Sequence, residues 1–185
     1  MKNIQSLKNE ESRILVSPEA NEKPRGLGTL RYIAYCNNDA PLVLERSKEV
    51  LLKVNRALQF GDPEETEWSS ILPAYFVYRC VPDCPHTLSK RRVELRRKLY
   101  NIMTPEENGL FIDMLSWNLL SWIHWFQNEE RYWYWWDSCL HDNNRILVTV
   151  EIHEWPCPTD ELSWLFRGCG AYSFEEEPED VNPNL

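Results

Sequence analysis

Three side chains able to bind a metal ion stand close together near the middle of the sequence. Cys80, Cys84 and His86 form a Cys-x3-Cys-x-His cluster in a proline-bearing segment. Thiolate and imidazole groups at short spacing are ligands that zinc favours. No second ligand pair follows at a fixed spacing, so tertiary folding would have to supply Cys139, His141, His153 or Cys157. We therefore expect ordinary half-buried thiols and no cofactor, and a zinc site stays open as an alternative.

A second group of titratable side chains lies between residues 141 and 154. His141 and Asp142 occupy a turn-like segment, whereas Glu151 and His153 share the outward face of a strand pattern. A histidine beside a carboxylate can exchange protons near neutral pH, as general acid–base catalysis requires. The sequence offers no identifiable nucleophile and no Gly-rich phosphate loop to accompany the pair. An exposed polar strand face is the simpler interpretation, and a metal-dependent or acid–base enzyme is the alternative function.

An unbroken run of five aromatic residues, Tyr132 to Trp136, comes just before this segment. Consecutive side chains of a strand point to opposite faces, so the five rings cannot all occupy one core. A helix packed on the second face would cover the remaining rings. Alternatively, the rings form a binding surface, because Trp and Tyr are enriched among interface anchors. Trp133 and Trp135 are our candidate anchors.

The charge balance narrows the class of partner. The formal net charge is −9 and the isoelectric point is near 5.0, which argues against a general nucleic-acid-binding protein. One basic stretch, residues 90–98, is best explained as a solvated helix face, and nucleic-acid contact there is a minor alternative. Acidic side chains at Glu64, Glu65 and Glu67 form a second candidate surface for a basic protein partner.

The pattern along the chain predicts an α+β fold in which an antiparallel sheet packs against several α-helices. Alternation from Ile146 to Ile152, after an aromatic run and a turn, predicts a β-hairpin over residues 132–153. Apolar spacing and capping residues predict the other elements. These are a strand at 30–36 and helices at 41–59, 89–103, 104–126 and 159–169.

We expect one domain, residues 29–174, between a flexible arm at 1–28 and an acidic tail at 175–185. The start of the chain is charged, and the longest apolar stretch, 111–126, is interrupted by polar residues, so neither a secretory signal nor a membrane span is expected. The six cysteines then indicate reduced thiols and a cytoplasmic location.

Residues 117–171 resemble small bacterial toxin-immunity proteins. The resemblance is carried by the segments WNLLSWIHWF, WYWWDS, RILVTVEIHEWP and ELSWLFRGCGA, which cover under a third of the chain. It implies a protein without enzymatic activity that binds and blocks one cognate toxin, for example a nuclease with a cationic cleft. The residues we expect at that interface are Glu151, His153, Glu154, Trp133 and Trp135, with Glu64, Glu65 and Glu67 as a second candidate surface.

Overall fold

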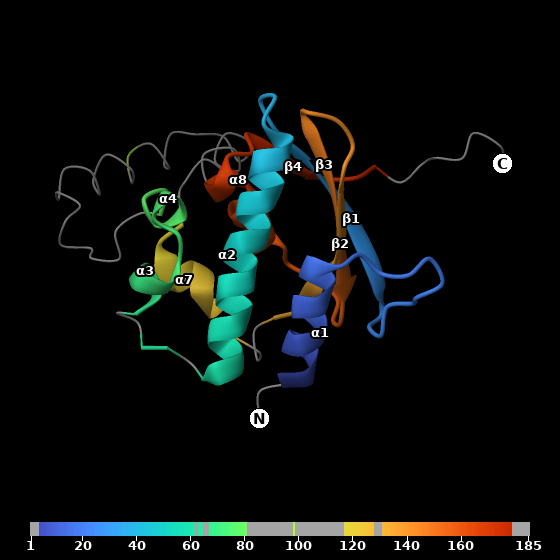
Figure 1. The fold of residues 1–185 in the computed structure, drawn as a ribbon, viewed down its shortest axis with the longest axis horizontal. Helices are drawn as coiled ribbons and strands as arrows, with labels where there is room; N and C mark the ends of the chain where they lie inside the picture. Colours follow the sequence, from blue (N-terminus) through green and yellow to red (C-terminus); the bar gives the residue numbers. More distant parts are fainter. Residues whose placement is uncertain are drawn as a thin grey trace.

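The computed structural model describes residues 4–61, 63–64, 67–80, 98, 117–127 and 131–178. Figure 1 shows its elements in chain order. The helices are α1 (Ile4–Leu15), α2 (Ala40–Phe60), α3 (Trp68–Ile71), α4 (Ala74–Val77), α7 (Leu119–His124) and α8 (Asp160–Cys169). The strands are β1 (Gly28–Tyr35), β2 (Trp133–Leu140), β3 (Arg145–Ile152) and β4 (Ser173–Glu176).

The four strands form one antiparallel sheet in the order β2-β3-β1-β4. The predicted hairpin is confirmed: β2 and β3 pair from Trp133↔Ile152 to Leu140↔Ile146, with a bulge between Trp135 and Asp137. β1 pairs with β3 over its whole length, and the short β4 adds to the other side of β1. The α+β fold class is therefore also confirmed.

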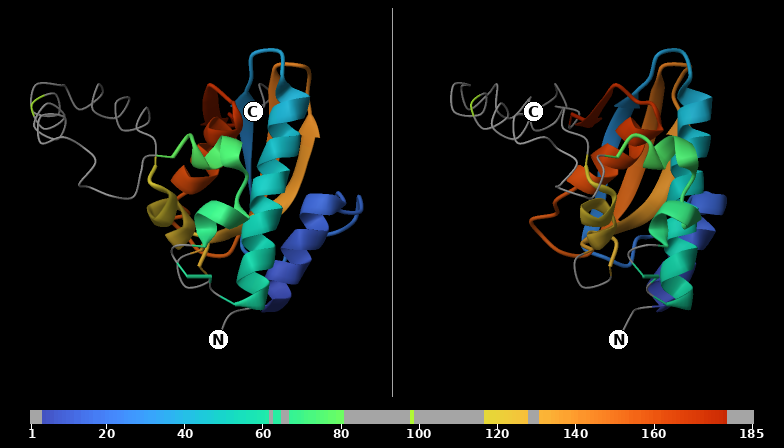
Figure 2. Two further views of the ribbon diagram at one scale, coloured as in Figure 1. Left: turned by 60° about the vertical axis from the view of Figure 1, so that its left-hand side comes forward. Right: turned by 90° about the vertical axis from the view of Figure 1, so that its left-hand side faces the viewer.

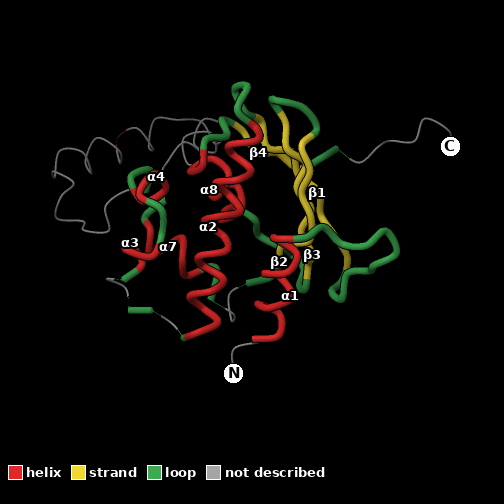
Figure 3. The backbone as a smooth tube through the Cα atoms, viewed as in Figure 1, coloured by secondary structure: helices red, strands yellow, loops and turns green. Residues whose placement is uncertain are grey.

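Apart from α1, the described helices lie on one side of this sheet. Figures 2 and 3 show α2, α7 and α8 against one face and α1 along the β2 edge, with no described helix over the opposite face. The side chains of Ile146, Val148 and Val150 point from β3 into the helices and are fully buried. The predicted stripe of α2 meets them, since Val43, Val50 and Val54 are also fully buried. The core sits between α2, α8 and this inner face of the sheet.

The expectation of a flexible arm over residues 1–28 fails within its first half. Residues 4–15 form α1, which packs against α2 and β2. Leu7, Glu10 and Ile14 are each at most 1 % exposed and lie on one side of the helix. The amphipathic pattern escaped detection because a carboxylate, Glu10, occupies the middle of the buried stripe.

Several other boundaries differ from the prediction. Glu175 and Glu176, assigned to the tail, are paired with β1 as part of β4. Within the predicted helix 104–126, the structure describes only the end, where α7 begins after Asn118, whose side chain accepts a hydrogen bond from Ser121 N at 2.7 Å. Thr159 precedes α8 as expected, but its hydroxyl donates to Tyr32 Oη at 3.2 Å instead of capping the helix. The predicted helix 89–103 lies outside the described residues apart from Lys98.

None of the described helices combines the length and apolarity needed to cross a membrane.

Candidate functional site

The two predicted tryptophan anchors are core residues, so that prediction was wrong. Trp133 is 0 % and Trp135 is 1 % exposed. Both side chains point toward the helices: Trp133 lies edge-on to Phe126, with ring centres 5.8 Å apart, and Trp135 stacks on Phe166 at 6.1 Å. Their spacing of two along β2 puts them on the same inner face. Neither indole is available to a partner.

The alternate rings, Tyr134 and Trp136, are covered by α1 and the residues around it, and not by a partner. Tyr134 lies edge-on to His153, with ring centres 5.1 Å apart, and hydrogen-bonds with Ser6 of α1. Burial raises the pKa of the Tyr134 phenol. The guanidinium of Arg13, also from α1, lies 4.7 Å from the centre of the Trp136 ring. The aromatic run is therefore divided between the core and α1.

Glu10 connects α1 to the free edge of β2. Its carboxylate accepts hydrogen bonds from the backbone N–H of Trp135 at 2.8 Å and from Asn55 Nδ2 at 2.8 Å. It also forms a two-point ion pair with the guanidinium of Arg131. The side chains of Glu10 and Arg131 are both wholly buried. An edge-strand N–H that would face solvent is thus satisfied by a helix side chain.

Glu151 holds the segment that leads from α1 to β1. Its Oε1 atom accepts the backbone N–H groups of Arg25 and Gly26, both at 2.5 Å, and lies 3.4 Å from His153 Nε2. The expected outward orientation of Glu151 is correct, but the side chain is buried beneath this segment instead of exposed. Glu151 therefore serves the fold, whereas His153 remains open to solvent.

These contacts surround a cavity of about 380 Å³, which we call the α1 cavity. Its walls come from α1, residues 22–25 and the outward side of β2 and β3. Arg13 pairs with Glu22 across its rim. The lining carries both signs of charge and the aromatic side chains of Tyr134, Trp135 and Trp136, and most of its charged groups already have partners within the protein.

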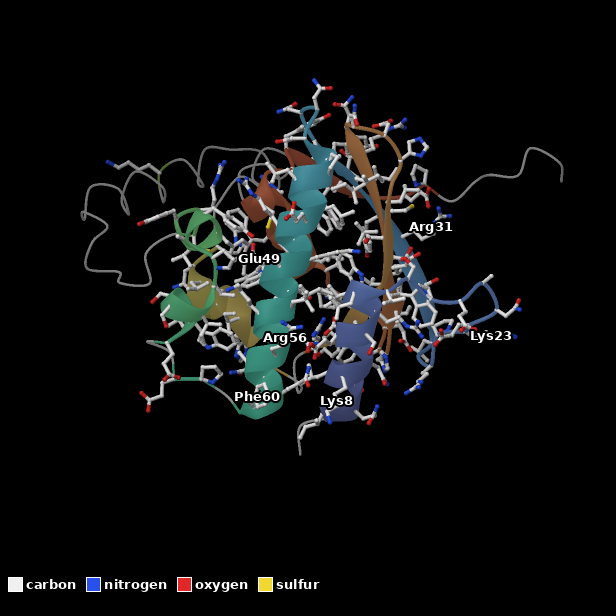
Figure 4. The ribbon with its side chains drawn as sticks, viewed as in Figure 1. Lys8, Lys23, Arg31, Glu49, Arg56 and Phe60 are labelled. Atoms are coloured by element: carbon white, nitrogen blue, oxygen red, sulfur yellow. The ribbon has the colours of Figure 1, made fainter. Side chains whose placement is uncertain are left out.

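Beyond the cavity, the sheet presents an uncovered surface that we call the outer face. It consists of Arg31, Ile33, Tyr35, Leu147 and Thr149, which alternate with the buried residues of β1 and β3. Ile33 and Leu147 are cross-strand partners, both half-buried and both outside the core cluster. Figure 4 shows Arg31 projecting from β1 on the side away from α2. Two apolar side chains therefore lie side by side under no described helix.

The remaining predicted interface residues are dispersed. Glu154 is exposed at the end of the hairpin, next to Trp155, which is 67 % exposed. Glu64 and Glu67 are exposed near the start of α3, on the other side of α2 from the hairpin, as Figure 1 shows. Glu65 lies outside the described residues. The structure does not bring the two predicted acidic surfaces together.

The candidate metal ligands and the hairpin histidines do not form a centre in the described structure. Cys84 and His86 lie outside the described residues, and no group of three His, Cys, Asp or Glu side chains suited to a metal occurs within them. His141 is at the turn of the hairpin and His153 at its open end, roughly 25 Å apart for strands of this length. Burial raises the pKa of the Cys36 and Cys157 thiols to about 11, which keeps them protonated. Cys36, Cys139, Cys157 and Cys169 are free thiols.

Comparisons of the chain with protein-family models, curated proteins and solved structures found no match. Sequence reasoning missed Glu10, Arg131 and the Ile33–Leu147 pair. Only the last left a usable signal, since apolar residues at outward positions of two strands break the expected alternation.

Proposed function

We propose that the protein acts by binding another protein through the outer face, without catalysis. The observation that carries this proposal is the Ile33–Leu147 pair, which lies at the centre of a sheet face that no described helix covers. An apolar pair in such a position would be shielded from water by a docked partner. Trp133 and Trp135, which are buried in the core, do not contribute to this surface.

The surroundings of the pair resemble the layout of a protein interface, in which an apolar centre is ringed by polar groups. Tyr35 lies near Tyr172, with ring centres 6.2 Å apart, and Tyr172 is 59 % exposed. Arg31 pairs with Glu177 at 2.7 Å at the border of the face. Tyrosine and arginine are also residue types that supply much of the binding energy at interfaces.

The partner class we propose is a cationic protein toxin, which the chain would inhibit by occupying its active surface. Support for this comes from the resemblance of residues 117–171 to toxin-immunity proteins and from the net charge of −9. A surplus of negative charge accelerates association with a basic partner and disfavours nucleic acid. The interface would extend to the end of the sheet beside the α1 cavity, where His153 lines the cavity and is followed by Glu154 and Trp155.

The acid–base alternative has less support from the geometry. Within the described part of the hairpin, one carboxylate lies near an imidazole: Glu151 Oε1 is 3.4 Å from His153 Nε2. Glu151 Oε1 already accepts two backbone N–H groups, so its electron pairs are committed to holding residues 25 and 26. The pair explains how the segment before β1 is attached to the sheet.

The experiment is a comparison of affinity capture by wild-type protein and by an outer-face variant, Ile33→Lys with Leu147→Thr. Threonine suits a strand, and the new lysine would face Glu175 across the β1–β4 pair, where the opposite charges favour pairing. The matched control is Leu42→Lys, which replaces an exposed apolar side chain on α2. Captured proteins are identified, and the principal one is purified and recombined with each variant.

We expect wild-type and control proteins to bind the purified partner one-to-one and to suppress its activity. The outer-face variant should bind at least about 100-fold more weakly, as loss of an interface centre predicts. Circular dichroism and the unfolding midpoint check that the variant is folded. Equal binding by a folded outer-face variant would contradict the proposal.

A further inference from the structure

β4 leaves a row of backbone hydrogen-bonding groups unpaired at the edge of the sheet. The N–H of Glu177 donates to Arg31 O at 2.8 Å, so in the antiparallel pattern alternate residues of β4 face β1. Phe174 and Glu176 are the residues of β4 that do not bond to β1, and their N–H and C=O groups point away from the sheet. β4 is the last strand in the order β2-β3-β1-β4, and no described strand pairs with its outward side. This contrasts with the β2 edge, where Glu10 accepts the N–H of Trp135.

A groove runs beside this edge, between β4 and α8. It has a volume of about 610 Å³, and we call it the β4 groove. Asp160, Ser163 and Arg167 line it from α8, and Phe174 and Glu176 line it from β4. The Phe174 ring stacks on Tyr32 at 5.1 Å and on Phe166 at 5.2 Å, so the strand is anchored to the core. A fixed edge strand facing a helix across a groove is the arrangement in which extended peptides add to sheets.

The charges of the groove select among possible occupants. Asp160 and Glu176 are exposed and Arg167 is half-buried, and none of them forms an ion pair with another described side chain. A second copy of β4 would place Glu175, Glu176 and Glu177 against their own equivalents, and like charges on paired strands repel. A segment carrying lysine or arginine would instead face the unpaired carboxylates.

We propose that the β4 edge and the β4 groove bind an extended, lysine- or arginine-bearing segment of a protein partner, which adds to the sheet as a fifth strand. The outward N–H and C=O groups of Phe174 and Glu176 hold its backbone. The carboxylates of Asp160 and Glu176 hold its cationic side chains. This inference rests on the proposed binding function, and it names a second contact surface and the chemistry of the segment that occupies it.

The experiment titrates the full chain with a synthetic peptide of sequence Thr-Lys-Val-Lys-Val-Thr, blocked at both ends. Binding is followed by amide NMR, with hydrogen exchange of the Phe174 and Glu176 amides as the site-specific readout. Three comparisons accompany it: a peptide with glutamate in place of lysine, a backbone N-methylated peptide, and protein carrying Asp160→Asn with Glu176→Gln. The matched control, Glu19→Gln with Glu45→Gln, removes the same charge from exposed carboxylates that do not line the groove.

We expect the lysine peptide to slow exchange of both amides, and the glutamate and N-methylated peptides to leave exchange unchanged. The groove variant should bind the lysine peptide roughly tenfold more weakly than the control variant, as two exposed ion pairs predict. Equal affinity of the two variants, or shifts confined to other strands, would overturn the inference. Its failure is separable from that of the proposed function, because capture of a partner through Ile33 and Leu147 does not depend on the peptide result.

Discussion

Glu10 and Arg131 form an ion pair with no exposed surface on either side chain, although 120 residues separate them along the chain. The pair joins α1 to the start of β2, and the Arg131 guanidinium lies 4.7 Å from the centre of the Trp133 ring. The same carboxylate also accepts the N–H groups of Asn55 and Trp135. Because buried charges are tolerated only when they are compensated, the position of α1 depends on this pair.

Replacing Glu10 should therefore destabilise the protein strongly. Glu10→Gln retains the size of the side chain but leaves the buried Arg131 charge uncompensated, which we expect to lower the free energy of unfolding by about 3–5 kcal/mol. Urea unfolding followed by circular dichroism measures the loss. The neighbouring Glu11→Gln is the control: it removes the charge of a partly exposed pair with Arg56 but keeps an oxygen that can accept from Gln59, so it should cost less than about 1 kcal/mol. Similar losses of unfolding free energy in the two variants would show that the Glu10–Arg131 pair does not hold α1 in place.

Substitution of buried and exposed tryptophans should have different effects on stability. Trp133→Ala and Trp135→Ala should each lower the free energy of unfolding by about 3–5 kcal/mol, because they empty the core beneath α8. Trp155→Ala makes the same chemical change at an exposed site and should alter stability by no more than about 0.5 kcal/mol. Equilibrium denaturation of the three variants measures these changes in the free energy of unfolding. If Trp133→Ala left the free energy of unfolding unchanged, Trp133 would again be a candidate interface anchor.

Glu161 predicts how stability changes with pH. Its side chain is 2 % exposed, Oε1 accepts the Trp133 indole N–H, and Oε2 has no hydrogen-bond partner among the described residues. Burial raises the pKa of this carboxyl from 4.5 to about 7. The folded state then holds a proton that the unfolded state has lost, so this contribution to stability is complete below pH 4.5 and disappears as the pH rises to 7.

The measurement for Glu161 is the free energy of unfolding of wild-type and Glu161→Gln proteins across that pH range. The amide does not titrate, so the wild type should lose up to about 3 kcal/mol relative to the variant as the pH increases. Parallel pH profiles would show that Glu161 does not titrate within this window.

Adding a side chain at Gly26 should loosen the segment that leads to β1 beside the α1 cavity. A Cβ atom at this position would collide with the backbone oxygen of Ile152 and approach the ring of His153. Gly26→Ala should displace the segment held by Glu151, and trypsin should cleave after Arg25 about tenfold faster. Gly28→Ala is the control, because nothing lies within 4 Å of a Cβ there. Unchanged proteolysis of Gly26→Ala would contradict the proposed attachment.

The residues that the sequence placed correctly are those whose local pattern matches their surroundings. Ile146, Val148, Val150 and Ile152 alternate with polar or outward residues because one face of β3 packs on helices. The α2 stripe and the start of α8 are predicted for the same reason. Here hydrophobic periodicity and burial agree, so the elements follow from the sequence.

The residues that the sequence misplaced depend on partners far along the chain. Glu151 is charged, and its burial follows from the backbone of Arg25 and Gly26, which are 126 and 125 residues away. Glu175 and Glu176 lack strand propensity, and their pairing with β1 creates the strand. Trp133 and Trp135 fit a core or an interface equally well until the positions of the helices are known.

A calorimetric titration of the purified partner with wild-type protein and with the Ile33→Lys, Leu147→Thr variant tests most directly whether the outer face binds the partner. Binding through the outer face predicts a one-to-one complex with the wild type, inhibition of the partner in proportion to the bound fraction, and affinity reduced at least about 100-fold in the variant. Full affinity of a correctly folded variant, or chemical turnover of the partner by the wild type, would show that the outer face is not where this protein acts.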